Sequence, residues 1–378
     1  MTVINSIEDL RVLARRRLPR ALFDYIDRGS YDEHTWARNR ADLRALQLRQ
    51  RVMVDVSKLD TATTVLGDRW GFPLALAPTG LMGLFYREGE IQAARAAQAA
   101  GIPFCLSTMS ICPLEDVRAA FGGILWFQLY VMRDRGFNDA LIARAQSAGC
   151  RALVVTLDLP LQALRRRDPK NGLAVPPRLT WASARDFVRR PGWVWGVLGS
   201  RHRTFGNLAT FFPRKGTAAL SEWMGSQLGP LTPGDLAWVR DRWPGKLVLK
   251  GILDAEDAKL AVATGADAVI VSNHGGRQLD GATSTIAALP RVVDAVQGRC
   301  DVLMDGGVGS GQDVLKALAL GARGCLTGKA FLYGVASRGQ AGVALALDIM
   351  RREFEISMAL SGSGRAVDVG PANLVQTT

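Results

Sequence analysis

The segment DVLMDGGVGSGQDVLKALALGARGCLTGK, residues 301–329, contains the pattern on which the fold prediction rests. A short apolar run, 302–304, is followed by small and polar residues and then by a helical pattern, after which a second apolar run begins at 324. Strand, helix and strand in this order form one βα unit. Because the apolar character is continuous rather than alternating, it indicates parallel strands that are covered on both faces.

Six further apolar runs of this kind precede that segment. They cover residues 73–77, 103–106, 125–129, 153–157, 246–249 and 268–271, and the last run is 324–326. Helical patterns lie between them, for example over 88–100 and 253–264. Eight βα units predict an α/β fold, a closed (β/α)₈ TIM barrel, and a doubly wound open sheet is the weaker alternative.

The length of 378 residues fits one barrel domain, 1–378, with additions. Residues 1–70 precede the first run and are expected to form helices that cap the barrel. Nearly 90 residues separate the fourth run from the fifth, which predicts an insertion over 161–225 after the fourth strand. With 48% hydrophobic and 22% charged residues, the composition excludes a disordered or fibrous chain.

The net charge of +12 is concentrated in this insertion, since residues 161–216 contain twelve basic and two acidic side chains. Over 181–225 the arginines alternate with aromatic residues, and no apolar run reaches the length of about 18 residues that spans a bilayer. The pattern favours a segment that lies on an anionic membrane surface, where a quinone would be within reach. A solvated or oligomer-facing loop is the alternative. Nucleic-acid binding is disfavoured, because no binding module accompanies the charge.

The five cysteines are widely spread and lack the spacing of metal ligands, so we expect a reducing compartment and no metal site. The basic start of the chain is not followed by the apolar region of a leader peptide. We therefore expect a cytoplasmic protein, bound peripherally to the inner face of the cell membrane.

Polar or small residues follow every apolar run, at the end of the barrel where active sites lie. Among them are Pro78, Thr79, Gly80, Ser107, Gln128, Tyr130, Thr156, Asp158, Lys250, Ser272, Asp305 and Thr327. Together they predict a large polar ligand across the barrel mouth. The last two loops, 305–311 and 327–329, are glycine-rich turns that lead into helices and would present backbone N–H groups to a phosphate.

His274 follows the sixth run and precedes two glycines. Its imidazole could accept a proton near neutral pH, with Asp158 as its partner. Arg165 and Arg277 offer two planar forks that suit a carboxylate. A base, a carboxylate clamp and a phosphate site indicate an anionic substrate that reacts beside a phosphorylated cofactor. Lys250 could form a rim salt bridge, act as a Schiff-base nucleophile or place a positive charge beside the cofactor, and these residues alone do not separate the three.

The stretch VSNHGGRQLDG, residues 271–281, closely resembles the active-site signature of the FMN-dependent L-2-hydroxy acid dehydrogenases and oxidases. The resemblance runs over residues 7–361 and is supported by four further segments, LPRALFDYIDRGSYDE, FQLYVMRDRGF, LVLKGILDAEDA and ALALGARG. Among the members of the family, the chain is most similar to bacterial L-lactate dehydrogenases. The resemblance implies oxidation of an L-2-hydroxy acid, L-lactate first, to the 2-oxo acid, with FMN as cofactor and a quinone or another acceptor. Members are often tetramers. The alternatives are a mandelate-type dehydrogenase, an oxidase that uses oxygen, and an impaired flavoprotein or basic surface-binding protein.

The resemblance also implies roles for single residues. His274 would be the base with Asp158 as its partner, and Lys250 would stabilise the reduced flavin. The substrate would be bound by Tyr25, Tyr130, Arg165 and Arg277. The implied FMN contacts are Pro78, Thr79, Gly80, Ser107, Gln128, Thr156, Lys250, Ser272, Asp305, Gly306, Gly307, Gly309, Gly328 and Lys329. Whether the proton comes from the substrate's hydroxyl or its carbon is left open.

Two positions depart from the family pattern, and a third differs from glycolate oxidase. The family usually has a phosphate-binding arginine where this chain has Gly309, and a second one where it has Lys329. Losing planar forks weakens phosphate capture, so we expect FMN either to bind loosely or to depend on Ser310, Lys329 and backbone amides. Met109 stands where glycolate oxidase has tryptophan, which predicts a wider substrate pocket.

Overall fold

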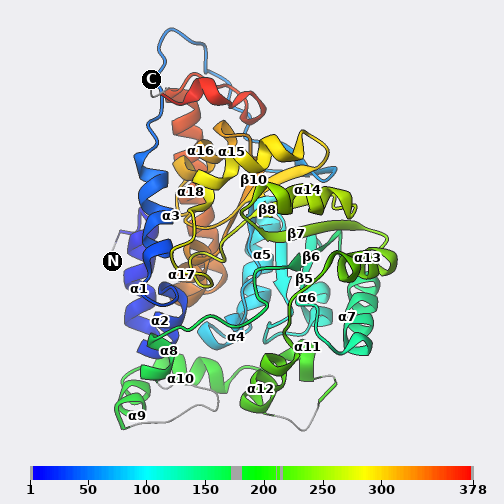
Figure 1. Cartoon of the computed structure of the whole chain (residues 1–378). Helices are drawn as coiled ribbons and strands as arrows, with labels where there is room; N and C mark the ends of the chain where they lie inside the picture. Colours follow the sequence, from blue (N-terminus) through cyan, green and yellow to red (C-terminus); the bar gives the residue numbers. More distant parts are fainter. Residues whose placement is uncertain (1–2, 172–180, 210, 213–215, 376–378) are drawn as a thin grey trace.

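The computed structural model describes residues 3–171, 181–209, 211–212 and 216–375. Eight parallel strands close into a barrel in the order β10-β3-β4-β5-β6-β7-β8-β9 (Figure 1). Their bounds are β3 (Leu74–Leu76), β4 (Phe104–Ser107), β5 (Leu125–Leu129), β6 (Ala152–Thr156), β7 (Lys246–Ile252), β8 (Ala268–Val271), β9 (Asp301–Met304) and β10 (Gly324–Thr327). Each strand coincides with one predicted run, so the barrel is confirmed and the open sheet is ruled out.

The barrel is wrapped by helices that follow its strands. These are α4 (Met82–Phe85), α5 (Gly89–Ala100), α6 (Leu114–Ala120), α7 (Arg135–Ser147), α13 (Pro233–Arg242), α14 (Ala255–Ala263), α15 (Thr285–Val296), α16 (Gly311–Ala319), α17 (Lys329–Arg338) and α18 (Gln340–Leu360), with short 3₁₀ turns η1 (Ala366–Asp368) and η2 (Pro371–Asn373) near the end. Every residue of β5 and β6 is buried, as expected for strands between an apolar barrel interior and a layer of helices.

The strand register brings polar side chains together at the carboxyl ends of the strands. Ser107 is paired with Gln128, and Thr156 with Lys250. Just beyond Lys250 the register between β7 and β8 shifts, and Gly251 has a φ of 108° there. A Cβ atom on Gly251 would lie 2.8 Å from the Cβ of Asp158, so glycine permits the close approach of Asp158 to the end of β7.

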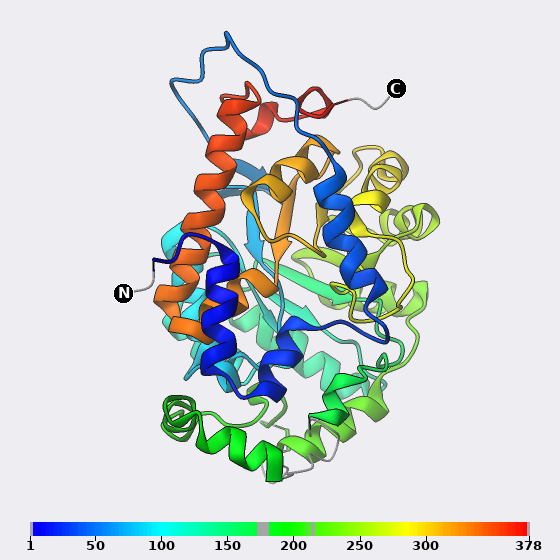
Figure 2. The ribbon, with the colours of Figure 1, turned by 90° about the vertical axis from the view of Figure 1, so that its left-hand side faces the viewer.

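The segment before the barrel contains α1 (Ile7–Arg17), α2 (Arg20–Asp27) and α3 (His34–Ala45), which lie together on one side of the barrel (Figure 2). Not all of residues 1–70 are helical, however. An antiparallel hairpin of β1 (Thr63–Val65) and β2 (Asp68–Trp70) packs buried Trp70 among the side chains of the barrel interior. Its turn has positive φ at Leu66 and Gly67, which suits a tight hairpin and not a helix.

The segment after β6, where the sequence predicts an insertion, contains short helices that lie beneath the barrel mouth (Figure 1). They are α8 (Arg167–Lys170), α9 (Trp181–Val188), α10 (Pro191–Leu198), α11 (Gly206–Ala209) and α12 (Thr217–Gln227). The Trp193 indole donates a hydrogen bond to the Leu84 carbonyl at 2.7 Å, and the Asn207 amide donates to the Ser107 carbonyl at 3.3 Å. In the described part of the chain, no helix is both long and apolar enough to cross a membrane.

The aromatic residues of the insertion fall into two sets. Phe211 and Trp223 pack against Phe137 of α7, with ring centroids 4.6 and 5.1 Å apart, and Phe205 is buried. Trp195 is 74% exposed on α10. The side chain of Trp181 lies outside the described residues. Several aromatics of 181–225 therefore fix the insertion to the barrel and are not available to a membrane.

Candidate active site

A cavity of about 1310 Å³, which includes solvent at its mouth, lies at the carboxyl ends of the strands. Most of the predicted site residues line it, namely Tyr25, Pro78, Thr79, Gly80, Ser107, Tyr130, Arg165, Lys250, His274, Arg277, Asp305, Gly306, Gly307, Gly309, Gly328 and Lys329. The structure thus gathers side chains from the N-terminal helices and from loops after most of the strands around one space.

His274 is held by Asp158 at the edge of this cavity. Its Nδ1 lies 3.0 Å from Asp158 Oδ1, and an ionised carboxylate only accepts, so Nδ1 carries the proton. Burial raises the pKa of Asp158, but His274 and Lys250 outweigh burial and hold that pKa below its ordinary value. Among the described residues Nε2 has no hydrogen-bond partner, which leaves it able to accept a proton from a molecule in the cavity.

Arg277 and Arg165 both lie close to the ring of Tyr25. Their guanidinium carbons are 4.8 and 5.5 Å from the centroid of its ring. Arg277 Nη1 donates to the carbonyls of Tyr25 and Arg28 at 2.6 and 2.8 Å. Burial first, and then Arg165, lower the pKa of Arg277 to about 10, so this guanidinium is charged at neutral pH. The Arg165 Nε is buried without a partner in the described structure. Two such cations can bind one carboxylate.

Tyr130 lines the cavity beside these arginines. Burial first, and then Asp158 and Tyr25, raise the pKa of its phenol. The hydroxyl therefore stays protonated and can donate a hydrogen bond to an anion in the cavity.

Lys250 is buried at the end of β7. Its ammonium lies 3.0 Å from Asp305 Oδ2 and donates to the Ser272 hydroxyl at 2.7 Å. Burial alone would lower the pKa of Lys250, but Asp305 and Asp158 raise it above the ordinary value. An amine that keeps its proton is not a nucleophile, which argues against a Schiff base and for a fixed positive charge.

Four predicted residues stand outside the cavity wall. Asp158 hydrogen-bonds to His274, and the Ser272 hydroxyl accepts a hydrogen bond from Lys250. Gln128 and Thr156 form a buried hydrogen-bonded chain with Ser107. In that chain Ser107 Oγ donates to Gln128 Oε1, and Gln128 Nε2 donates to Thr156 Oγ1, both at 3.0 Å. These side chains position the groups that face the cavity.

The glycine-rich loops form the other end of the cavity. Gly328 precedes α17 without a side-chain cap, so the first N–H groups of that helix have no intrahelical partner. A Cβ on Gly309 or Gly328 would meet no atom closer than 3.7 or 3.9 Å, which leaves space for a bound group. Ser310 accepts a hydrogen bond from the Asp313 amide at 3.1 Å and thereby caps α16, a role that the sequence pattern did not indicate.

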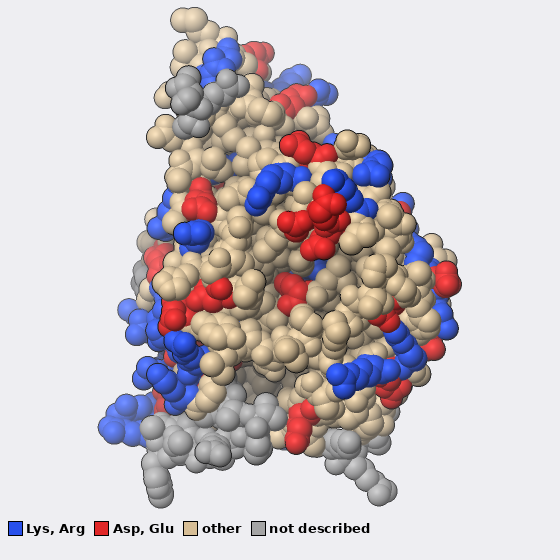
Figure 3. Space-filling view, viewed as in Figure 1, with Lys and Arg blue, Asp and Glu red and all other residues tan. Residues whose placement is uncertain are grey.

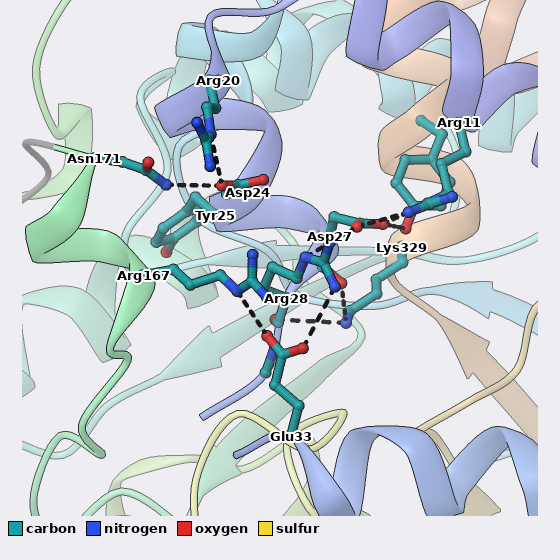
Figure 4. Close-up of polar contacts among 12 residues, drawn as sticks. Arg11, Arg20, Asp24, Tyr25, Asp27, Arg28, Glu33, Arg167, Asn171 and Lys329 are labelled. Carbon is teal, nitrogen blue, oxygen red and sulfur yellow. Dashed lines mark hydrogen bonds and ion pairs between the residues drawn. The ribbon is translucent and has the colours of Figure 1, made fainter. Parts of the chain in front are cut away.

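Lys329 and two residues of α3 also face this end of the cavity. Lys329 Nζ donates to the Asp27 carbonyl at 3.0 Å, and Figure 4 shows it beside Asp27 and Arg28. Trp36 and Arg40 line the cavity as well, although no motif marks them in the sequence. The one signal in the sequence is their spacing: Trp36 and Arg40 are four positions apart, which places them on the same face of a helix.

The barrel and this site define a class of proteins: TIM-barrel enzymes that bind a phosphorylated cofactor beside an anionic substrate. The comparisons with known proteins specify the class further. The family model of FMN-dependent dehydrogenases matches residues 14–376. The chain therefore belongs to the FMN-dependent dehydrogenase family; it is an oxidoreductase, and FMN is its cofactor.

Similar proteins cover nearly the whole chain. An L-lactate dehydrogenase of Caulobacter vibrioides (strain NA1000 / CB15N) is 52% identical over 95% of this chain and 94% of its own. One of Stenotrophomonas maltophilia (strain R551-3) is 46% identical over 99% of both chains. The crystal structure of the monotopic membrane protein (S)-mandelate dehydrogenase superposes with a TM-score of 0.95, at 36% identity over 100% of both chains. The crystal structure of a mandelate oxidase with (S)-4-hydroxymandelic acid superposes with a TM-score of 0.86, at 37% identity over 98% of both chains.

The residues of the cavity fit FMN. Thr79 Oγ1 and Asp305 Oδ1 are buried without a hydrogen-bond partner among the described residues, and buried polar atoms in proteins are normally paired. Both residues line the cavity together with His274 and the glycine-rich loops. A polar flavin with a phosphate tail would satisfy these atoms and the open helix terminus together.

Proposed function

We propose that this chain oxidises an L-2-hydroxy acid, with L-lactate as the first choice, to the 2-oxo acid. The observation that carries this proposal is the position of the His274–Asp158 pair and of two guanidinium groups on one cavity with the glycine-rich loops. A 2-hydroxy acid has a carboxylate for Arg165 and Arg277 and a hydroxyl-bearing carbon for His274. These are the two chemical features that the site recognises.

In the proposed reaction, bound FMN would accept the two electrons that leave the substrate's α-carbon and one of the two protons that the substrate loses. Arg165 and Arg277 bind the substrate carboxylate, and Tyr25 and Tyr130 hydrogen-bond to it. His274 Nε2 takes one proton from the substrate, and Asp158 stabilises the resulting imidazolium. Lys250 keeps a positive charge at the end of β7, where negative charge on the cofactor would be stabilised.

L-lactate is preferred because the relatives with 46% and 52% identity are L-lactate dehydrogenases. A mandelate-type substrate is the second candidate, since the backbone superposes on (S)-mandelate dehydrogenase with a TM-score of 0.95. Met109 lines the cavity and leaves more room for a large substrate side chain than a tryptophan would.

We expect the flavin absorbance of the purified protein to bleach under argon when L-lactate is added, and D-lactate to have no effect. The measurement is the rate of bleaching over a panel of L-2-hydroxy acids that includes glycolate and L-mandelate. Faster bleaching by L-mandelate than by L-lactate would replace the first candidate by the second. A flavin that no member of the panel bleaches would contradict the proposed function.

We also propose that the chain binds peripherally to the inner face of the cell membrane through α9 and α10, and that a quinone takes the electrons. Val188, Trp195 and Leu198 are 80%, 74% and 51% exposed on these helices. Lys and Arg side chains gather at the same end of the molecule, where Figure 1 places α8 and α9 (Figure 3). Exposed apolar groups beside cations suit an anionic lipid surface.

The double change Trp195→Ser and Leu198→Ser is expected to weaken binding to anionic lipid vesicles by about tenfold or more, because each removed side chain loses apolar burial. Co-sedimentation with vesicles measures this effect. Met53→Ser is the matched control, since Met53 is fully exposed on a different segment, next to residues that contact the end of α18. Equal sedimentation of all three proteins would contradict the membrane surface, and faster turnover with oxygen than with a quinone would favour an oxidase.

A further inference from the structure

In the part of the chain that the structure describes, two cations at the glycine-rich end of the cavity form no ion pair with a carboxylate. Among the described residues, Lys329 Nζ donates only to the backbone carbonyls of Asp27 and Arg28. The Asp27 carboxylate is engaged by Arg11 at 2.6 Å and by the Tyr333 hydroxyl at 2.7 Å. Within the described residues, no group accepts a hydrogen bond from the Arg40 guanidinium. Charges in such a partly buried place are normally paired, so we expect this end of the cavity to bind an anion.

Trp36 connects the two cations. The Lys329 ammonium lies 5.0 Å from the centroid of its ring, and the guanidinium carbon of Arg40 lies 5.9 Å from it. All three side chains line the cavity together with Gly309. Burial first, and then Arg277 and Arg40, lower the pKa of Lys329; Asp27 and Glu33 offset this only in part, so the pKa lies well below its ordinary value. This positive field would be relieved by a bound dianion.

Helix α3 is held rigidly against the cavity, so Arg40 is placed by the fold. The amides of Asn39 and Asn273 exchange hydrogen bonds at 2.9 and 2.8 Å, which joins α3 to the loop after β8. A Cβ on Gly307 would lie 3.0 Å from the Asn39 carbonyl oxygen. The residue before Arg40 therefore touches the first glycine-rich loop directly.

We infer that Arg40, together with Lys329, binds the phosphate of FMN and replaces the arginine that the family usually has at the position of Gly309. The inference rests on FMN as the cofactor and concerns how this chain holds it. An arginine supplies a planar fork of N–H donors for phosphate oxygens, which Gly309 cannot supply and Lys329 supplies only as a point charge. The Trp36 ring lies near enough to both cations for a cation–π contact with each.

The test compares FMN with riboflavin, which lacks the phosphate, in binding titrations of the full-length apoprotein followed by flavin fluorescence. For Arg40→Leu we expect the dissociation constant of FMN to rise about 10- to 100-fold and that of riboflavin to stay the same, because one charged hydrogen-bonding group is lost. Arg38→Leu is the matched control, since Arg38 is exposed on the same helix and does not line the cavity. It should bind both flavins as the unchanged protein does.

A second variant tests the replacement itself. Gly309 has room for a side chain and no positive φ, so adding Gly309→Arg to Arg40→Leu should restore most of the preference for FMN over riboflavin. The inference is wrong if Arg40→Leu binds FMN as tightly as the unchanged protein, or if it loses both flavins equally. If the unchanged protein binds neither flavin, the cofactor itself is wrong and the inference fails with it.

Discussion

Replacing His274 by glutamine is expected to leave FMN bound and to slow the reduction of the flavin by L-lactate by about 100- to 10,000-fold. The amide of glutamine can still donate a hydrogen bond to Asp158, which His274 Nδ1 contacts at 3.0 Å, but it cannot accept a proton. Rapid mixing under argon, followed by flavin absorbance, measures the rate directly. The amount of FMN that remains with the purified variant shows whether the site is intact.

His202 provides the matched control, since its Nε2 lies 2.6 Å from the Asp116 carboxylate and it does not line the cavity. His202→Gln should reduce its flavin at the unchanged rate.

Asp158→Asn should slow the reduction of the flavin less than His274→Gln does, because the base remains and only its partner is neutralised. The pKa of Asp158 lies below its ordinary value, so the wild-type carboxylate stays charged above the usual carboxyl range, and this loss should be constant there. Rapid reduction in His274→Gln would remove the proposed base.

The barrel could be predicted because its signal is local. Each strand, such as β5 or β8, is a short apolar run that is buried on both faces, and the sequence shows such runs without knowledge of their neighbours. The hairpin at 63–70 was missed, since two strands of three residues leave almost no periodic pattern. Its role depends on Trp70, whose burial in the barrel interior appears only in three dimensions.

Side chains at strand ends could be predicted to share the site, because the carboxyl ends of all barrel strands meet at one face. The contribution of α3 could not. Its place follows from a contact between distant segments, where a Cβ on Gly276 would lie 2.4 Å from the backbone nitrogen of Trp36. The sequence likewise shows how many aromatic residues the insertion contains. It does not show that Phe211 and Trp223 pack on Phe137 and so are not free to contact a membrane.

Replacing Arg277 by lysine is expected to raise the KM for L-lactate about 100-fold or more, because a bidentate contact with the substrate carboxylate becomes a single point charge. Steady-state kinetics of the holoenzyme with a quinone analogue measure KM and kcat separately. Arg166→Lys is the matched control, since Arg166 lies in the neighbouring loop, pairs with Asp32 and is half-exposed. It should leave both constants unchanged.

Arg277 also has a structural contact that must be separated from substrate binding. Its Nη1 donates to the carbonyls of Tyr25 and Arg28, so the lysine variant is expected to melt at a lower temperature as well. The pH dependence of the unchanged enzyme separates the two roles. The pKa of Arg277 is lowered to about 10, so the clamp is fully charged at neutral pH and loses its proton as the pH rises through that value. KM for L-lactate should therefore increase as the pH approaches 10 while FMN stays bound. An unchanged KM in an Arg277→Lys variant that melts at a lower temperature would show that this guanidinium is structural and does not hold the substrate.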